Sequence, residues 1–350
     1  MKKFLALLLA LVMVFALAAC GTDDPGNATT DPNAGESTPA ESTNGESLGY
    51  VGISMPTQSL ERWNRDGAFL RDQFEASGYQ AELLYANNEV DQQVSDIQNL
   101  IADGVDLLVI SAIDGESLNT VVDEAAENGI PVIAYDRLIM NDNVDYYVSF
   151  DNYSVGVLQG QYLEEQLGLA DRTADDPAYI EFTAGDPADN NAPFFFNGAM
   201  SILQPYLDSG VLVCLSNQTE FDVVATEQWN TDTALDRAQT ILASYYSGGE
   251  HLDAWLCSND STALGVTQAV TSDYTGDNTV IITGQDGDVA NLRNVLDGTQ
   301  AMTVYKAVAN EAVATLDIAA AILAGDPVDE ALIEAAGWDF EASLDTATYT

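Results

Sequence analysis

The sequence predicts an α/β fold of two lobes, each built around a parallel sheet. Short apolar runs of strand length alternate with amphipathic stretches of helix length from residue 48 onward. Strand, helix and strand in this succession are typical of parallel sheets covered by helices on both faces. The foldable part comprises roughly three hundred residues, which is too many for one typical core and fits two.

Ten apolar runs are expected to form the strands. They are Tyr50–Met55, Ala81–Tyr85, Leu107–Ile110, Val132–Tyr135, Tyr146–Phe150, Tyr179–Phe182, Val211–Leu215, Ala254–Cys257, Val280–Ile282 and Met302–Tyr305. Because ten strands are many for one open sheet, we expect two sheets of about five. The break falls near Ser149–Gly156, and the lobes are expected to join at Tyr153–Val155 and near Lys306. The helix between the first two runs is expected to have Ser59 as its N-cap and Gly78 as its stop.

The N-terminal residues predict export. Lys2 and Lys3 precede the apolar run Phe4–Ala19, which is short for a membrane span and is typical of a signal peptide over residues 1–20. The sequence Leu-Ala-Ala-Cys that ends at Cys20 resembles the lipobox of bacterial lipoproteins. That resemblance implies lipid attachment at Cys20 and an extracytoplasmic, membrane-anchored protein. The alternative is a plain signal peptide with a chance cysteine.

Composition divides the rest of the chain. Residues 21–47 contain no aromatic residue and consist of Gly, Thr, Asp, Pro, Asn, Glu, Ser and Ala, which predicts a disordered linker. We expect an N-terminal lobe from residues 48–153 plus 307–326, a C-terminal lobe from 154–306, and a C-terminal segment over 327–350.

The chain is strongly acidic, with 10 Lys and Arg against 56 Asp and Glu and a formal charge of −46. Such a chain is not expected to bind nucleic acid, because that affinity comes from neutralising phosphates. Cys214 and Cys257 lie inside apolar runs, which favours buried free thiols over a disulfide. The single histidine, His251, lies in a loop with no second ligand spaced near it, so a surface position is expected.

Polar residues follow most of the apolar runs. They include Asp136-Arg137, Asp151-Asn152, Ser258-Asn259-Asp260, Gln285-Asp286, Lys306 and the loop residues Asp189-Asn190-Asn191. Ligands of open α/β sheets bind outside the carboxyl ends of the strands. Helix N-capping alone would explain Ser258 and Asn152, but it does not explain Arg137, Gln285 or Lys306. These strand ends are therefore expected to form a ligand site.

This set of residues lacks the motifs of cofactor and metal chemistry. No GxGxxG or Walker lysine follows the first run, and no His, Cys and carboxylate cluster has metal spacing. No serine in a GxSxG motif has a histidine available to act as its general base. We therefore expect no cofactor, no metal and no catalytic residue. Asp136 with Asp189 or Asp286 could in principle hydrolyse glycosides, but flanking cations and amides would keep these carboxyls ionised.

The same set suits a neutral polyol. Sugar hydroxyls both donate and accept hydrogen bonds, carboxylates only accept, Arg and Lys only donate, and amides do both. Pairing every hydroxyl avoids the cost of burying an unsatisfied polar group. Trp63 and Trp229 are candidates to cover the apolar faces of a sugar ring, although each could instead fill the core.

Eight sequence blocks together resemble the sugar-binding lipoproteins and periplasmic proteins that feed ABC importers, closest to the xylose-binding and multiple-sugar-binding branch. The blocks are ERW at 61–63, VIAYDRLI at 132–139, SFDNYSVGVLQ at 149–159, DNNA at 189–192, GAMSILQPYLDSG at 198–210, SND at 258–260, GQD at 284–286 and MTVYK at 302–306. The resemblance spans about residues 50–306. It implies the type I periplasmic binding protein fold, with two Rossmann-like lobes that close on a ligand about a hinge.

The resemblance also implies a ligand set and partners. The residues that match the sugar contacts of the family are Arg62, Trp63, Asp136, Arg137, Asp189, Asn191, Trp229, Asn259, Asp286 and Lys306. We expect a monomeric receptor that captures a monosaccharide of the xylose, galactose, glucose or arabinose type and delivers it to an ABC permease. A sugar sensor for a chemoreceptor or sensor kinase is an alternative, and a glycoside hydrolase is an alternative of another class.

One departure from the family pattern concerns the C-terminal end. In the family, the helix after the lysine is followed by a loop and a further strand that returns to the second lobe. The chain given stops at Asp345–Thr350, about where that strand would be approached, so the final strand is expected to be missing.

Overall fold

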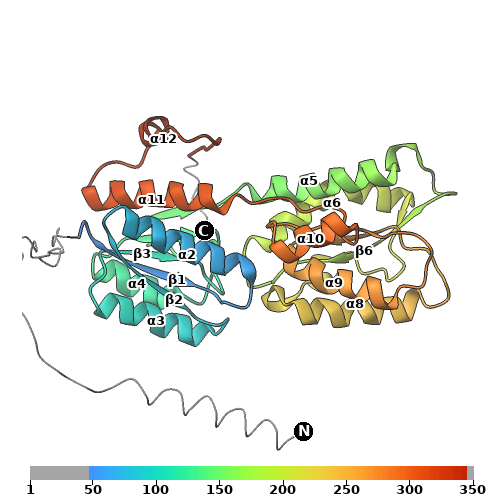
Figure 1. Ribbon diagram of the computed structural model, residues 1–350, viewed down its shortest axis with the longest axis horizontal. Helices are drawn as coiled ribbons and strands as arrows, with labels where there is room; N and C mark the ends of the chain where they lie inside the picture. Colours follow the sequence, from blue (N-terminus) through green and yellow to red (C-terminus); the bar gives the residue numbers. More distant parts are fainter. Residues whose placement is uncertain (1–46, 345–350) are drawn as a thin grey trace, which may run out of the picture. The chain divides into compact units, whose positions relative to one another are not determined.

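The computed structural model describes residues 47–344, which contain two parallel sheets (Figure 1). The first sheet has the order β2-β1-β3-β4-β5. Its strands are β1 (Tyr50–Met55), β2 (Gln80–Tyr85), β3 (Leu107–Ile110), β4 (Val132–Tyr135) and β5 (Tyr146–Val148). The helices between them are α2 (Glu61–Ala76), α3 (Val90–Ala102) and α4 (Asn119–Glu127).

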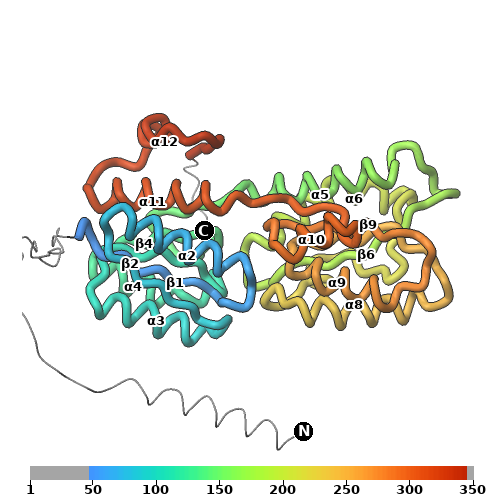
Figure 2. Tube along the Cα trace, viewed as in Figure 1, coloured from blue at the N-terminus to red at the C-terminus, as the bar shows by residue number. Residues whose placement is uncertain are grey.

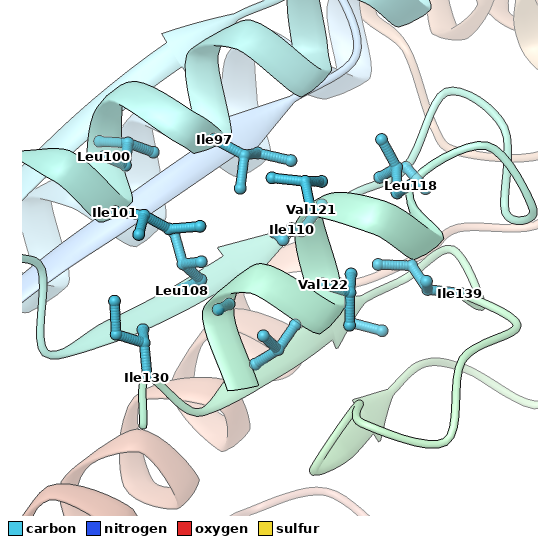
Figure 3. Packing of buried hydrophobic residues seen from close by; sticks show 14 of the residues in the cluster. Ile97, Leu100, Ile101, Leu108, Ile110, Leu118, Val121, Val122, Ile130 and Ile139 are labelled. Atoms are coloured by element: carbon cyan, nitrogen blue, oxygen red, sulfur yellow. The ribbon is translucent and has the colours of Figure 1, made fainter. Parts of the chain in front are cut away.

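Both faces of the first sheet are covered, and this explains why β3 and β4 are apolar throughout. Leu108 and Ile110 pack with α3 and α4, whereas the alternating residues Leu107 and Val109 pack with α2 and with α11 (Val308–Ala324). Figure 3 shows the cluster on the α3 and α4 face. Each fully buried aliphatic side chain contributes about 1.5–3 kcal/mol. The sheet with these four helices is the first lobe.

The second sheet has the order β7-β6-β8-β9. Its strands are β6 (Ala178–Thr183), β7 (Leu212–Val213), β8 (Ala254–Cys257) and β9 (Ile281–Ile282). One face packs on α5 (Asn152–Leu167) and α6 (Ala192–Ser209), and the other on α8 (Thr231–Tyr245) and α9 (Asp260–Asp273). This sheet and its helices, with α10 (Val289–Asp297), are the second lobe. The remaining elements are α7 (Phe221–Val224), α12 (Glu330–Ala336) and the short 3₁₀ helices Leu169–Asp171 and Glu227–Trp229.

Two glycines allow α5 and α6 to approach each other backbone to backbone. A Cβ atom on Gly156 would lie 1.9 Å from the carbonyl oxygen of Phe195, and one on Gly198 would lie 2.2 Å from that of Tyr153. Any larger residue at these positions would push the helices apart. The contact fixes the start of α6 and with it the loop that precedes α6, which carries Asp189.

The fold class is confirmed as α/β with parallel sheets, and nine of the ten expected strands are present. The strand expected at Met302–Tyr305 is wrong, because this segment makes only a single bridge, between Val304 and Gln285. The expected N-cap is also wrong: α2 begins after Leu60, and the side chain of Ser59 does not cap it.

Between residues 47 and 344, the chain passes between the two sheets twice, and both passages can be followed in Figure 2. The first is the segment 149–151 between β5 and α5. Tyr153–Val155, where a join was expected, lies in the first turn of α5. The second passage lies between Val304 and the start of α11.

The two ends of the chain lie partly outside the described residues. Within residues 47–344, the segment after α11 contains α12 and no strand. The expected signal peptide, most of the linker and Cys20 lie outside the described residues. Across the described range, no helix is long and apolar enough to cross a membrane.

Candidate ligand-binding site

A cavity lies where the carboxyl ends of strands from both sheets meet. It contains about 370 Å³ of space not filled by atoms, open solvent at its mouth included. Its walls are formed by Leu60, Arg62, Trp63, Asp136, Arg137, Asp189, Phe195, Trp229, Asn259, Ser261, Gln285, Asp286 and Lys306. The residues after β4, β6, β8 and β9 thus converge as the strand-end rule predicts.

Nine of the ten residues that the sequence assigns to the site line this cavity; Asn191 does not. Its amide Nδ2 donates to the carbonyl oxygen of Asp136 at 2.6 Å, and its Oδ1 accepts from the Tyr147 hydroxyl at 2.9 Å. Asn191 therefore lies behind the wall and holds the backbone that presents Asp136.

The Asp136 carboxylate is held between two cations. Its Oδ2 accepts from Arg62 Nη2 at 2.6 Å and from Lys306 Nζ at 2.8 Å. Burial alone would raise the pKa of this carboxyl, but the charges of Arg62 and Lys306 outweigh it and hold the pKa below its usual range. Asp136 is therefore a permanent anion that accepts hydrogen bonds and cannot serve as a general acid at neutral pH.

Arg62 is the centre of a buried cluster that extends behind the cavity. Its guanidinium pairs with Asp66 at 3.1 Å, with Glu311 at 3.1 Å and with Asp286 at 3.5 Å, in addition to Asp136. Burial raises the pKa of Asp66 to about 6, and burial with the nearby Asp136 charge raises the pKa of Glu311 well above its ordinary value. Among the described residues, Asp66 Oδ1 and Glu311 Oε1 have no hydrogen-bond partner.

Sequence reasoning missed both of these carboxyls. Asp66 had a usable signal, since it follows Arg62 by four residues and so lies on the same side of α2. Glu311 had none, because it lies on α11 near the C-terminal end of the fold and reaches Arg62 only through tertiary packing.

A second group of polar contacts is organised around Asp189. Its Oδ2 lies 3.2 Å from Arg137 Nε and accepts from the indole Nε1 of Trp229 at 3.1 Å. Arg137 also donates from Nη1 to the carbonyl oxygen of Ala112 at 3.0 Å. Asp189 belongs to the second lobe and Arg137 to the first, so this pair joins the two cavity walls.

Both tryptophans lie in the cavity wall, 3% and 4% exposed. The ring of Trp63 faces the guanidinium carbons of Arg62 and Arg137, each 4.9 Å from its centroid. Trp229 packs edge-on against Phe195 and lies directly over Gly185, where a Cβ would be 2.0 Å from the indole. Only glycine at position 185 leaves room for the ring in this place.

The remaining wall comes from the ends of β8 and β9. Asn259 caps α9, because its Oδ1 accepts from the backbone N–H of Thr262 at 2.9 Å, and this fixes the orientation of its amide. Gln285 donates from Nε2 to the carbonyl oxygen of Ser258 at 2.9 Å, and its buried Oε1 has no partner in the described part of the chain. Gln285 stands among the polar strand ends in the sequence, but the family pattern did not include it.

Three of the residues assigned to the site have backbone φ angles in the left-handed region that favours glycine. The angles are +58° at Asp136, +54° at Trp229 and +106° at Asp286. Such conformations cost about 1–3 kcal/mol each and persist only where the surroundings enforce them. All three surround one cavity, which indicates that the fold tolerates backbone strain there in order to place these side chains.

Other groups considered from the sequence lie elsewhere. Cys214 and Cys257 are both free thiols, and His251 is half-exposed beside Asp253. Over residues 47–344, no group of three or more His, Cys, Asp or Glu side chains could hold a metal ion.

The chain is similar to a known protein family and to several characterised proteins. A model described as a periplasmic binding protein domain matches residues 51–327. The chain is 42% identical over 279 residues to the multiple sugar-binding periplasmic protein SbpA of Azospirillum brasilense, covering 79% of this chain and 77% of that protein. It is 36% identical over 256 residues to the D-xylose-binding periplasmic protein of Escherichia coli K12, covering 73% and 72%.

Solved structures agree with these sequence relatives. An ABC transporter solute-binding protein from Clostridium phytofermentans, crystallised with bound β-D-glucose, matches with a TM-score of 0.77 and 51% identity, covering 80% of this chain and 86% of that one. A carbohydrate transporter solute-binding protein from Chloroflexus aurantiacus in complex with D-glucose matches with a TM-score of 0.71 and 31% identity, covering 80% and 85%.

Proposed function

This chain belongs to the periplasmic binding protein family, among sugar-binding proteins of ABC transport, and from that premise we propose that it captures one pyranose monosaccharide in the cavity described above. The resemblance and the type I fold expected from the sequence are confirmed by these relatives. Because the family is one of binding proteins, the chain is not an enzyme, and the glycoside hydrolase alternative is rejected.

The observation that carries the proposal is the combination of charge and aromatic surface in one buried cavity. Asp136 offers an ionised acceptor, and Arg62, Arg137 and Lys306 offer hydrogen-bond donors. Trp63 and Trp229 supply flat apolar surfaces that can cover the faces of a sugar ring. Together these groups can pair each hydroxyl of a neutral sugar and cover its carbon skeleton.

A ligand panel tests the proposal. Xylose, glucose, galactose, arabinose and ribose are titrated by calorimetry, and the melting temperature is recorded with each. At about 1,000 times its dissociation constant, a ligand that binds only the folded chain stabilises it by about 4 kcal/mol. We expect at least one aldose to do so, with glucose and xylose first because relatives of this chain bind them.

Phosphorylated sugars are the matched controls in this panel. They should fail to bind, since Arg62, Arg137 and Lys306 already pair with Asp136 and Asp189, and a phosphate group would have to compete with these carboxylates. A nucleotide or an amino acid that binds more tightly than every aldose would overturn the proposal.

Family members work outside the cytoplasm, and we propose that this chain is tethered there by a lipid on Cys20 and hands its sugar to a membrane permease. The support is the sequence Lys2–Cys20, with its basic start, apolar run and Leu-Ala-Ala-Cys ending, and the absence of aromatic residues from 21–47. In cells, the parent chain is expected in the membrane fraction and a Cys20→Ser variant in the soluble fraction. Equal membrane retention of both would contradict the lipid anchor.

A further inference from the structure

A set of contacts outside the cavity joins the two lobes. Glu61 and Arg65, on the first turns of α2, meet the segment Asp286–Val289 that follows β9. Arg65 donates from Nη1 to the carbonyl oxygen of Gly287 at 3.0 Å and from Nη2 to that of Asp286 at 3.1 Å. Its Nη2 also lies 3.3 Å from Asp288 Oδ1. Neither Glu61 nor Arg65 belongs to the cavity wall.

Glu61 completes the start of a helix in the other lobe. Helix α10 begins at Val289, and the side chain of its N-cap residue, Asp288, makes no capping hydrogen bond. The backbone N–H of Val289 instead donates to Glu61 Oε1 at 3.0 Å. A carboxylate at this place satisfies an otherwise unpaired donor and interacts favourably with the helix dipole. An element of the second lobe is thus capped from the first.

The same segment presents Asp286 to the cavity. Asp286 has a φ angle of +106°, and its N–H donates to the carbonyl oxygen of Val304 at 2.9 Å. Arg62 holds the Asp286 side chain from inside the cavity at 3.5 Å, while Arg65, one turn later on α2, holds its carbonyl oxygen from outside. Helix α2 therefore contacts the segment Asp286–Val289 on two sides, through Arg62 and through Arg65.

We propose that Glu61 and Arg65 are positioning residues that form a latch: they stabilise the arrangement in which both lobes enclose the sugar, without touching the sugar. This inference rests on the proposed function. In this proposal the lobes separate to admit the sugar, so the contacts, which need the lobes together, form after the sugar has entered. The latch should therefore control how slowly the sugar leaves and have little effect on how fast it enters or on the stability of the sugar-free chain.

The test compares three variants of the full chain, Arg65→Met, Glu61→Gln and Arg71→Met, by calorimetry and stopped-flow kinetics with the aldose that binds the parent most tightly. Arg71 lies on the same helix, is exposed and pairs with its neighbour Asp72, so it is the matched control. We expect Arg65→Met to weaken binding about 5- to 30-fold, with a dissociation rate raised by the same factor. Glu61→Gln should act in the same direction and more weakly, and Arg71→Met should match the parent.

Other results would refute the latch alone, or the proposed function together with the latch. If Arg65→Met binds and releases the aldose like the parent, the latch is refuted while the proposed function stands. If it lowers the melting temperature of the sugar-free chain or slows association, Arg65 stabilises α2 itself, and the latch is also refuted. If the parent binds no aldose, the proposed function fails first and the latch fails with it.

Discussion

Replacing Arg62 by glutamine is expected to lower the free energy of unfolding by about 3–5 kcal/mol at pH 7.5, the usual cost of removing one partner from a buried ion pair. Arg62 is 6% exposed and is surrounded by the carboxyls of Asp66, Asp136, Asp286 and Glu311. Without the guanidinium, these groups are left with Lys306, which contacts only Asp136 among them. The folded variant can then relieve the repulsion only by taking up protons.

This loss should depend on pH in a defined direction. In the parent, burial already raises the pKa of Asp66 to about 6 and that of Glu311 well above its ordinary value, and the positive charge of Arg62 lowers both. Removing that charge raises them further. The folded variant then holds protons that the unfolded chain has released, so its stability falls as pH rises above the unfolded carboxyl range and recovers as pH decreases towards 5.

Denaturant unfolding of Arg62→Gln at pH 5 and pH 7.5 measures both effects. Arg71→Gln, the same substitution at an exposed position of the same helix, should change stability by less than about 0.5 kcal/mol at either pH. A loss for Arg62→Gln that is equal at both pH values would show that the buried carboxyls do not take up protons and would contradict the electrostatic explanation.

Replacing Asp136 by asparagine is expected to weaken sugar binding by roughly 100-fold or more. The substitution keeps the volume but turns one acceptor oxygen into a donor and removes the charge that Arg62 and Lys306 share. Hydrogen bonds to charged groups contribute about 1.5–3 kcal/mol each, and a mispaired hydroxyl adds a desolvation cost of similar order. At about 1.4 kcal/mol per decade, two such losses exceed a hundredfold.

Asp136→Asn should also lower the stability of the fold. Asp136 is 3% exposed, and its carboxylate pairs with Arg62 and Lys306. The substitution removes the negative charge that these two cations share. A loss of about 1–3 kcal/mol in the free energy of unfolding should therefore accompany the loss of affinity.

Calorimetry with the preferred aldose and denaturant unfolding without it separate the two effects. Asp142→Asn, an exposed position in the same lobe, is the control and should leave both quantities at parental values. Parental affinity in Asp136→Asn would place the sugar outside the cavity described here.

Much of the architecture follows from local patterns. The runs at β3 and β4 are apolar throughout, and that at β1 nearly so, because helices cover both faces, so their length and flanking residues were enough to identify them. Met302–Tyr305 has the same local pattern, yet this segment bends away after one bridge to enter the passage towards α11. Nothing in the segment itself distinguishes a short bridge from a paired strand.

The cavity lining was predictable where a polar residue lies one or two positions after a strand, as at Asp136 and Asn259. It was not predictable where tertiary packing alone brings a group in. Glu311 reaches Arg62 from α11, and Glu61 reaches α10 from α2. Asn191 shows the converse error, since a residue with the right chemistry and position in sequence turns its amide to a backbone carbonyl.

The placement of the tryptophans gives the molecule an internal optical reporter. The chain has four, and two of them, Trp63 and Trp229, form the cavity wall. Trp255 is buried in β8 with its indole N–H on Thr183, and Trp338 lies on the loop after α12 with its indole N–H on Asp317. Two of the four indoles therefore line the cavity, where guanidinium and carboxylate groups lie beside the rings. We expect a ligand that enters the cavity to change the tryptophan emission, so the unlabelled protein can report occupancy in real time.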